Sequence, residues 1–344
     1  MRWVVVGILA LAFACLLRPH AEQTGRAARV RAPLRVVPPT VRAEAREPIA
    51  QEPAAAEAAG EEEAVVEVCQ PTTLMHLLSV QNEDGSWGGA DEVVGSKSYG
   101  REGATALALL AFMGAGYSHL SKDTHRGIEV GPAIRRGLEW LQRNMPADTF
   151  NMTLAALALS EAYGLTGSQR WKDGAMDAVR HVAQAQDGAG GWGDTETSTW
   201  GGWVLASARL SDIPGYEPYE ARAAAYFADV APWDPAVLGA WALADRKKTP
   251  DKVEAAERLA ASAPAWGDFS RLYRAANGLF QADGPDGPRW REWSATLREM
   301  VVTRGRDGTW PLEGGATGRI VRHSLIVLTL ETYYRYANVF GSKG

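Results

Sequence analysis

The chain has 344 residues, and 46% of them are hydrophobic, which is enough for one large core or two modest ones and excludes wholesale disorder. Its 36 Lys and Arg against 41 Asp and Glu give a formal net charge of -5, so the positive excess typical of a nucleic-acid-binding protein is missing and we expect no nucleic-acid partner. Two cysteines, Cys15 and Cys69, are too few for a disulfide framework or a cysteine-rich zinc site.

Residues 1–17 are an apolar leader. The apolar run from Trp3 to Leu17 is about 22 Å long as a helix, shorter than the ~30 Å core of a bilayer. This length is typical of a signal peptide, although a retained membrane anchor or lipidation at Cys15 is also compatible with it. Because arginines follow the run instead of preceding it, the side of the membrane stays open. We expect a membrane-associated or exported protein of the cell envelope, with membrane contact through this segment.

Residues 18–67 separate the leader from the remainder of the chain. They are rich in Pro, Ala, Arg and Glu and have no sustained apolar period. This composition predicts a disordered tether. The expected folded domain therefore covers residues 68–341.

Three segments of that domain end in the pattern Gly-x-Trp. They are Gln81 to Trp87, Gln186 to Trp192 and Arg304 to Trp310. The glycine suits the positive φ that ends a helix, and the tryptophan can fold back to close the apolar space between two helices. We interpret the motif as a structural staple, and its spacing predicts weaker copies at residues 141–145 and around Trp233.

Apolar periodicity between turn signals predicts about twelve helices in six hairpins. The first members are expected near residues 72–81, 132–144, 168–186, 217–230, 250–261 and 288–304, and the second members near 101–117, 151–164, 199–210, 234–245, 266–281 and 318–337. The second members are apolar on all sides, as helices buried on both faces should be, whereas the first members carry charged faces. The expected fold is all-α, an α6/α6 toroid with six inner helices inside six outer ones.

With these Gln-x-Gly-x-Trp repeats on paired helices, residues 68–341 resemble the αα-toroids of squalene and hopene cyclases and of protein prenyltransferase β subunits. The segment 318–335, which follows Trp310, is similar to the end of bacterial prenyltransferase and squalene oxidase repeat proteins. That subgroup has no agreed activity. The resemblance therefore implies a fold and leaves the activity open.

The catalytic signatures of these relatives are missing. The run nearest to the Asp-x-Asp-Asp of hopene-type cyclases is Asp194-Thr-Glu-Thr, which we interpret as turn and helix-cap chemistry. Prenyltransferases hold zinc with an Asp, a Cys in an Asp-x-Cys context and a His, but here Glu67 and Val68 precede Cys69. We expect neither a metal nor a cofactor.

If the inner helices run the same way, their N-termini meet at one mouth of the ring, where aligned dipoles favour an anionic or carbonyl group. The ligand-binding candidates near that mouth are Arg271, Arg322, Tyr273, Trp203 and Thr153. The candidates for a general acid or base are Glu102 and His323. Ion pairing between helices is the alternative for the charged residues, and packing between helices is the alternative for the tryptophans. Thr199, Asp234 and Asp268 are expected helix N-caps.

Two functions are compatible with this domain. The first is an envelope-tethered, noncatalytic toroid that binds an apolar, isoprenoid-like ligand or a protein partner. The second is an enzyme of the terpenoid cyclase or prenyltransferase-like class, acting on an isoprenoid or a polysaccharide through Glu102 or His323. A strongly shifted pKa on either residue would favour the enzyme.

Overall fold

The computed structural model describes residues 73–305, 310 and 312–332 of the chain. The expected leader at residues 1–17, the expected tether at 18–67 and Cys69 lie outside the described residues. Within the described part, none of the helices combines the length and the apolar character that a membrane span requires.

The described chain is mostly helical, as the all-α prediction requires. Residues 73–79 are helical. The helices that follow are α3 (Arg101–Gly114), α4 (Val130–Arg143), α5 (Thr149–Thr166), α6 (Gln169–Gln184), α7 (Thr195–Leu210), α8 (Glu217–Val230), the 3₁₀ turn η1 (Pro235–Val237), α9 (Leu238–Ala244), α10 (Pro250–Ala260), α11 (Phe269–Asp283), α12 (Pro288–Arg304) and α13 (Ala316–Leu330). Each expected helix is present near its place, but the one expected at 234–245 is split into η1 and the short α9, and the end of the one expected at 318–337 lies outside the described residues.

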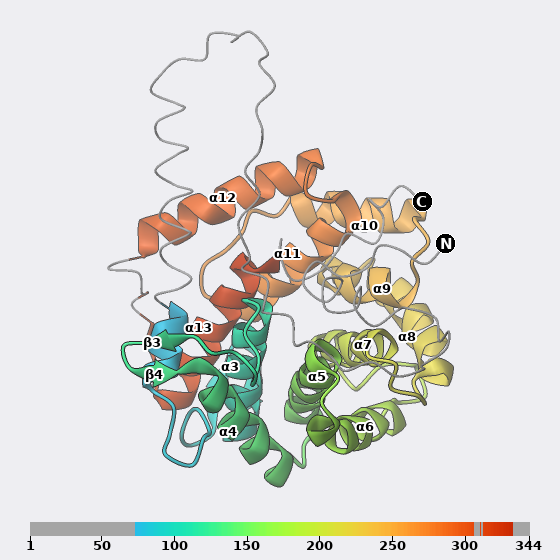
Figure 1. The fold of residues 1–344 in the computed structure, drawn as a ribbon. Helices are drawn as coiled ribbons and strands as arrows, with labels where there is room; N and C mark the ends of the chain where they lie inside the picture. Colours follow the sequence, from blue (N-terminus) through green and yellow to red (C-terminus); the bar gives the residue numbers. More distant parts are fainter. Residues whose placement is uncertain (1–72, 306–309, 311, 333–344) are drawn as a thin grey trace, which may run out of the picture.

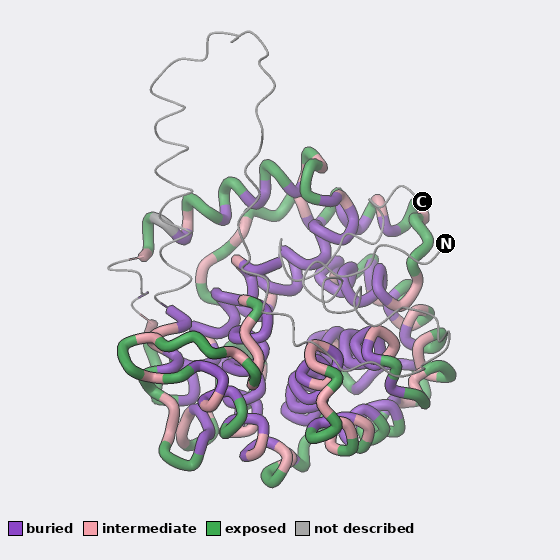
Figure 2. Tube along the Cα trace, in the orientation of Figure 1, coloured by how far each residue is buried: buried purple, intermediate pink, exposed green. Residues whose placement is uncertain are grey.

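The helices form two layers. α3 packs on α5, α5 on α7, α7 on α9, α9 on α11, α11 on α13, and α13 back on α3, so six inner helices close a ring (Figure 1). Helices α4, α6, α8, α10 and α12 lie around this ring, each against at least one inner helix. The inner helices are buried on nearly every side, whereas the outer helices expose one face (Figure 2).

Two short antiparallel hairpins interrupt the helical pattern. β1 (Glu92–Val94) pairs with β2 (Lys97–Tyr99), and β3 (Thr124–His125) pairs with β4 (Ile128–Glu129). The sequence did not indicate them, because strands of two or three residues are too short to show an alternating apolar pattern.

The first Gly-x-Trp segment joins three parts of the chain. The amide of Gln81 donates hydrogen bonds to the carbonyl oxygens of Gly85 and Ala133, both at 2.9 Å. The indole of Trp87 donates to the carbonyl of Leu77 at 2.7 Å. The segment therefore joins the helix at residues 73–79 to α4.

The second segment makes the same contacts. Gln186 donates to the carbonyls of Gly190 and Tyr219 at 2.9 and 3.0 Å, and Trp192 donates to the carbonyl of Val182 at 2.7 Å. These bonds tie α6 to α8 as the first set ties residues 73–79 to α4. A shared sequence pattern thus produces a shared set of contacts.

The third segment keeps the tryptophan contact, but one of the expected weaker copies does not form. The indole of Trp310 is 3.4 Å from the carbonyl of Val301 on α12. Trp233 is 86% exposed, so the expectation of a weaker staple around it is wrong. The reason is local: no glycine stands two positions before Trp233, where Ala231 continues a helical turn. Residues 141–145, the other expected weaker copy, form the end of α4 and the turn after it.

Candidate functional site

The N-terminal ends of the inner helices lie on one side of the ring, which we call the N-terminal face. The backbone N–H of Gly100 donates to the side-chain oxygen of Asn151 at 3.2 Å and so joins the starts of α3 and α5. Thr195 at the start of α7 donates to Asp234 beside η1 at 3.2 Å. Arg271 at the start of α11 pairs with the same aspartate at 3.0 Å.

Aspartates cap four of these helix starts, and the first is Asp148, whose carboxylate accepts from the N–H of Asn151 in α5 at 2.9 Å. The carboxylate of Asp194 accepts from the first backbone N–H groups of α7, and Asp234 and Asp268 do the same for η1 and α11. The expectation that Asp234 and Asp268 are N-caps is confirmed. The expectation for Thr199 is wrong: it lies inside α7 and donates to the carbonyl of Thr195 at 2.7 Å, because Asp194 starts the helix earlier.

The β1–β2 hairpin lies across the N-terminal face. Its Ser96 hydroxyl donates to Glu196 on α7 at 2.9 Å. The ammonium group of Lys97 pairs with Asp194 and donates to Thr197 at 2.7 Å. The hairpin is therefore bound to the start of α7.

The other end of the hairpin is bound to the start of α13. The carboxylate of Glu92 accepts from the backbone N–H groups of Gly315 and Gly318 at 3.0 and 2.8 Å. A carboxylate at this position satisfies N–H groups that have no partner within the helix. The hairpin thus spans the mouth of the ring from α13 to α7.

Glu196 is the buried carboxylate beneath the hairpin. One of its oxygens accepts from Ser96 on the hairpin and the other from Ser270 on α11, so it links α7 to α11 through side chains. Burial and the negative charge of Glu196 raise the pKa of nearby Tyr99 well above its usual value. The cap interpretation of the Asp194-Thr-Glu-Thr run applies to Asp194, whereas Glu196 makes contacts with distant residues that no local pattern indicates.

Three aromatic side chains from α7 and α11 pack together: Trp200, Trp203 and Tyr273. The ring centroids of Trp200 and Trp203 lie 4.8 Å apart, and Tyr273 lies 5.7 and 5.1 Å from them. All three side chains are buried. The structure therefore brings two ligand-binding candidates, Trp203 and Tyr273, into one packed cluster. For Trp203, this arrangement agrees with the alternative that the tryptophans pack between helices.

The two arginine candidates lie in different places and both have partners. Arg271 and Arg274 share Asp234 at 3.0 and 3.2 Å. Burial tends to raise the pKa of Asp234, but the charges of Arg274 and Arg271 hold it below its usual value. Arg322 donates to the carbonyl of Glu313 at 2.7 Å and lies 3.7 Å from Glu92. Both arginines therefore pair with neighbouring elements, which is the alternative to ligand binding that the sequence left open.

Thr153 and Glu102 also lie apart. The hydroxyl of Thr153 is buried and donates to the carbonyl of Phe150 in its own helix at 2.7 Å. Glu102 is half-buried in the first turn of α3. Neither contacts the aromatic cluster in the interactions that the structure describes.

His323 packs in the seam between α13 and the helix at residues 73–79. Its ring lies 4.8 Å from that of His76 and 6.5 Å from that of Trp310, and its Nδ1 is 2.8 Å from the carbonyl of Arg319. Burial, together with the charges of neighbouring His76 and Arg319, lowers the pKa of His323 to about 4. A general base works best with a pKa near the working pH, so this shift makes His323 a poor one.

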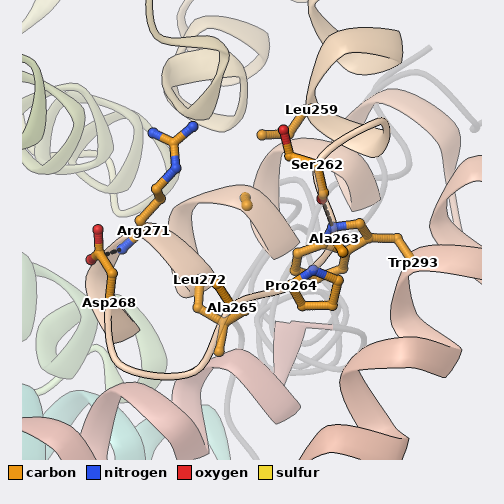
Figure 3. A pocket seen from close by; sticks show the side chains of 10 residues that line it. Leu259, Ser262, Ala263, Pro264, Ala265, Asp268, Arg271, Leu272 and Trp293 are labelled. Atoms are coloured by element: carbon orange, nitrogen blue, oxygen red, sulfur yellow. Dashed lines mark hydrogen bonds between the residues drawn. The ribbon is translucent and has the colours of Figure 1, made fainter.

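A small pocket opens beside the N-terminal face, between α10, α11 and α12 (Figure 3). Arg271 and Asp268 form one side, and Pro264 and Trp293 form the other. Its volume is about 50 Å³, a third of the ~150 Å³ cavity that holds a benzene molecule. It has room for one small apolar group.

No group of three or more His, Cys, Asp or Glu side chains in the described part of the chain is placed to hold a metal ion. No family model matches the chain, and no curated protein is significantly similar to it. The resemblance to prenyltransferase and squalene oxidase repeat proteins therefore rests on the repeat motif and the paired helices alone.

Proposed function

We propose that this chain is a noncatalytic binding module, built as an α6/α6 toroid, that meets a protein partner through its N-terminal face. Two observations support the toroid. Six inner helices close a ring inside a layer of outer helices, and two Gly-x-Trp segments make matching contacts between successive outer helices. In this proposal, residues 1–17 anchor or export the protein and residues 18–67 tether the toroid at the cell envelope.

Trp233 is the observation that carries the partner proposal. It is 86% exposed, and the next residue, Asp234, is the partner of Arg271. The side chain of Arg271 is 44% exposed and also borders the small pocket. Trp233 is thus next in the chain to the ion-pair partner of a pocket residue, and Trp and Arg are enriched among the residues that dominate binding energy in protein interfaces. We call Trp233, Arg271 and this pocket the Trp233 patch.

The size of the pocket favours a protein over an isoprenoid. A volume of about 50 Å³ admits a small apolar side chain, whereas an isoprenoid chain needs several times that space. The buried side chains of Trp200, Trp203 and Tyr273 pack against one another and reduce the space that a lipid would need there. A partner segment that inserts one side chain and places an acidic group near Arg271 fits the Trp233 patch.

The enzyme remains the second candidate, since the pKa of His323 is strongly shifted. The direction of the shift argues against a base, because a group with a pKa of about 4 is weakly basic at neutral pH. The packing of His323 against His76 and Trp310 accounts for the shift through burial.

Site-specific photocrosslinking in the native cells tests the partner proposal. A photoreactive phenylalanine analogue at position 233 of the full chain should give a discrete protein adduct. The matched control is position 120, where Leu120 is 64% exposed in the loop that follows the C-terminal end of α3.

The variant Arg271→Ala should remove the adduct at position 233, while Arg274 still pairs with Asp234 and keeps η1 joined to α11. An adduct that persists in Arg271→Ala, the same adducts from both positions, or none from position 233 would contradict the proposal.

A further inference from the structure

The inner helices end on the side of the ring opposite the N-terminal face, and we call this side the C-terminal mouth. The chain passes from α13 into its last residues here. Glu331 and Thr332, which follow α13, are both 0% exposed. A segment that left the molecule at this point would expose its first residues to solvent. Their burial therefore indicates that the residues that follow stay close to the ring.

Glu161 on α5 is a buried acidic residue near this mouth. It follows Phe150 by eleven residues, which is about three turns of helix, so the two residues share one face of α5. The ring of Phe150 packs edge-on against that of buried Tyr99 on the β1–β2 hairpin, with centroids 5.0 Å apart. This face of α5 therefore looks into the ring, and Glu161 lies on it about 16 Å closer to the C-terminal mouth. Its side chain is buried, with 6% of the residue exposed.

Gln281 on α11 lies in the same way. It follows Ser270 by eleven residues, and Ser270 donates to Glu196 beneath the hairpin. Gln281 is 0% exposed, and both Gln281 and Glu161 have interaction partners, as buried polar groups require. A carboxylate in such a place requires a cation or several hydrogen-bond donors next to it.

The residues that follow Thr332 have the complementary character. Residues 333–344 contain four aromatic residues, Arg335 and Lys343, and neither Asp nor Glu. The C-terminal ends of the inner helices carry partial negative charge, so they also favour a basic segment. Arg335 comes three residues after Thr332 and so begins within about 10 Å of the buried end of α13.

From these observations we propose that residues 333–344 dock in the C-terminal mouth, where Arg335 pairs with Glu161. The aromatic side chains of the segment cover the ends of α11 and α13, and Phe280, which is 3% exposed in the last turn of α11, is one of their contacts. The ring is then a cup closed at one end by its own chain, and a partner reaches its interior only from the N-terminal face. This inference holds whether or not the Trp233 patch binds a partner.

A double-mutant cycle in the full-length protein tests the ion pair. Arg335→Gln and Glu161→Gln should each lower the melting temperature by about 5 °C or more, because each leaves a buried charge without its partner. The double variant should lose no more than the more damaging single variant. Lys343→Gln is the matched control: it lies in the same segment, and its effect should add to that of Glu161→Gln.

Hydrogen exchange supplies an independent measurement. Removal of residues 333–344 should speed exchange at the C-terminal ends of α5, α11 and α13 and leave the β1–β2 hairpin unchanged. If the shortened protein does not fold, the cycle still decides. Additive effects of Arg335→Gln and Glu161→Gln would overturn the proposal. Unchanged protection in the shortened protein would overturn it too, because another part of the chain would then cover the mouth.

Discussion

His323 shows how a single buried residue couples stability to pH. It is neutral in the folded protein because burial disfavours the imidazolium, and His76 beside it also has a lowered pKa for the same first reason. Neither histidine gains a proton at mildly acidic pH without cost, because burial disfavours the charged form of both and the charge of Arg319 adds to this effect.

We expect the protein to lose stability as the pH falls below about 6.5. The folded pKa of His323 is about 4, below the unfolded value of 6.5, so its contribution is complete above pH 6.5 and declines as the pH falls toward 4. Linkage gives a loss of about 2 kcal/mol between pH 7.5 and pH 5 from this group. Urea unfolding at the two pH values should show this loss in wild type and a smaller one in His323→Leu.

His181 is the control for this measurement, because it is exposed on α6. His181→Leu should retain the pH dependence of the wild type. If His323→Leu retained it as well, the imidazole of His323 would not be the source.

At the scale of the helices, apolar periodicity and capping residues in the sequence predicted where most helices lie. Each helix followed from apolar periodicity, and the capping aspartates Asp234 and Asp268 marked their helix starts. Thr199 was misassigned because a sequence with several adjacent cap-type residues, Asp194 to Thr199, does not show which one begins the helix. Glu196 lies within the same run of cap-type residues. The run was therefore interpreted as cap chemistry, and the contacts of Glu196 with Ser96 and Ser270 were not predicted.

The staple turns give a prediction at this scale. Gly85 and Gly190 have φ values of +96° and +92°, and a Cβ there would lie 2.7 and 2.5 Å from the carbonyl oxygens of Arg136 and Arg222. Alanine at either position should lower the free energy of unfolding by about 2 kcal/mol or more, because a backbone clash adds to the strain of positive φ. Thermal or urea unfolding measures the change.

Gly95 distinguishes the strain of positive φ from the clash with a neighbouring backbone. Its φ is +63°, but a Cβ at this position would meet nothing within 4 Å. Gly95→Ala should therefore cost only the strain of the positive φ, about 1 kcal/mol. A similar cost at positions 85, 95 and 190 would show that the close contact with the neighbouring outer helix contributes nothing.

At the scale of the whole molecule, the ring closes where its first and last parts meet. The hydroxyl of Thr317 on α13 donates to the carbonyl of Ala90 at 2.7 Å and accepts from the N–H of Gly89 at 2.9 Å. Glu92 caps α13 from the same segment. These contacts join residues more than 220 positions apart in the sequence.

Thr317→Val should weaken both sides of this seam together. The substitution keeps the side-chain shape but leaves two backbone groups without a partner, at a cost of about 1–3 kcal/mol. Hydrogen exchange should become faster in the first turn of α13 and in residues 88–100. Thr296→Val, on the exposed side of α12, makes the same chemical change away from the seam and should cost less than about 0.5 kcal/mol. Faster exchange confined to α13 would contradict a closed ring.

The helices, their order, two of the caps and the staple motif could be predicted because each depends on residues within a few positions of one another. The contacts between Glu196 and Ser270, between Trp203 and Tyr273, and between Thr317 and Gly89 join positions about 70 or more residues apart, where no periodic signal connects the partners. Whether the centre of the ring is hollow or filled, and whether a charged residue faces a ligand or an ion-pair partner, depends on how side chains from different helices meet. Contacts between side chains of different helices depend on close packing and on the pairing of buried polar groups. Only the tertiary structure therefore determines them.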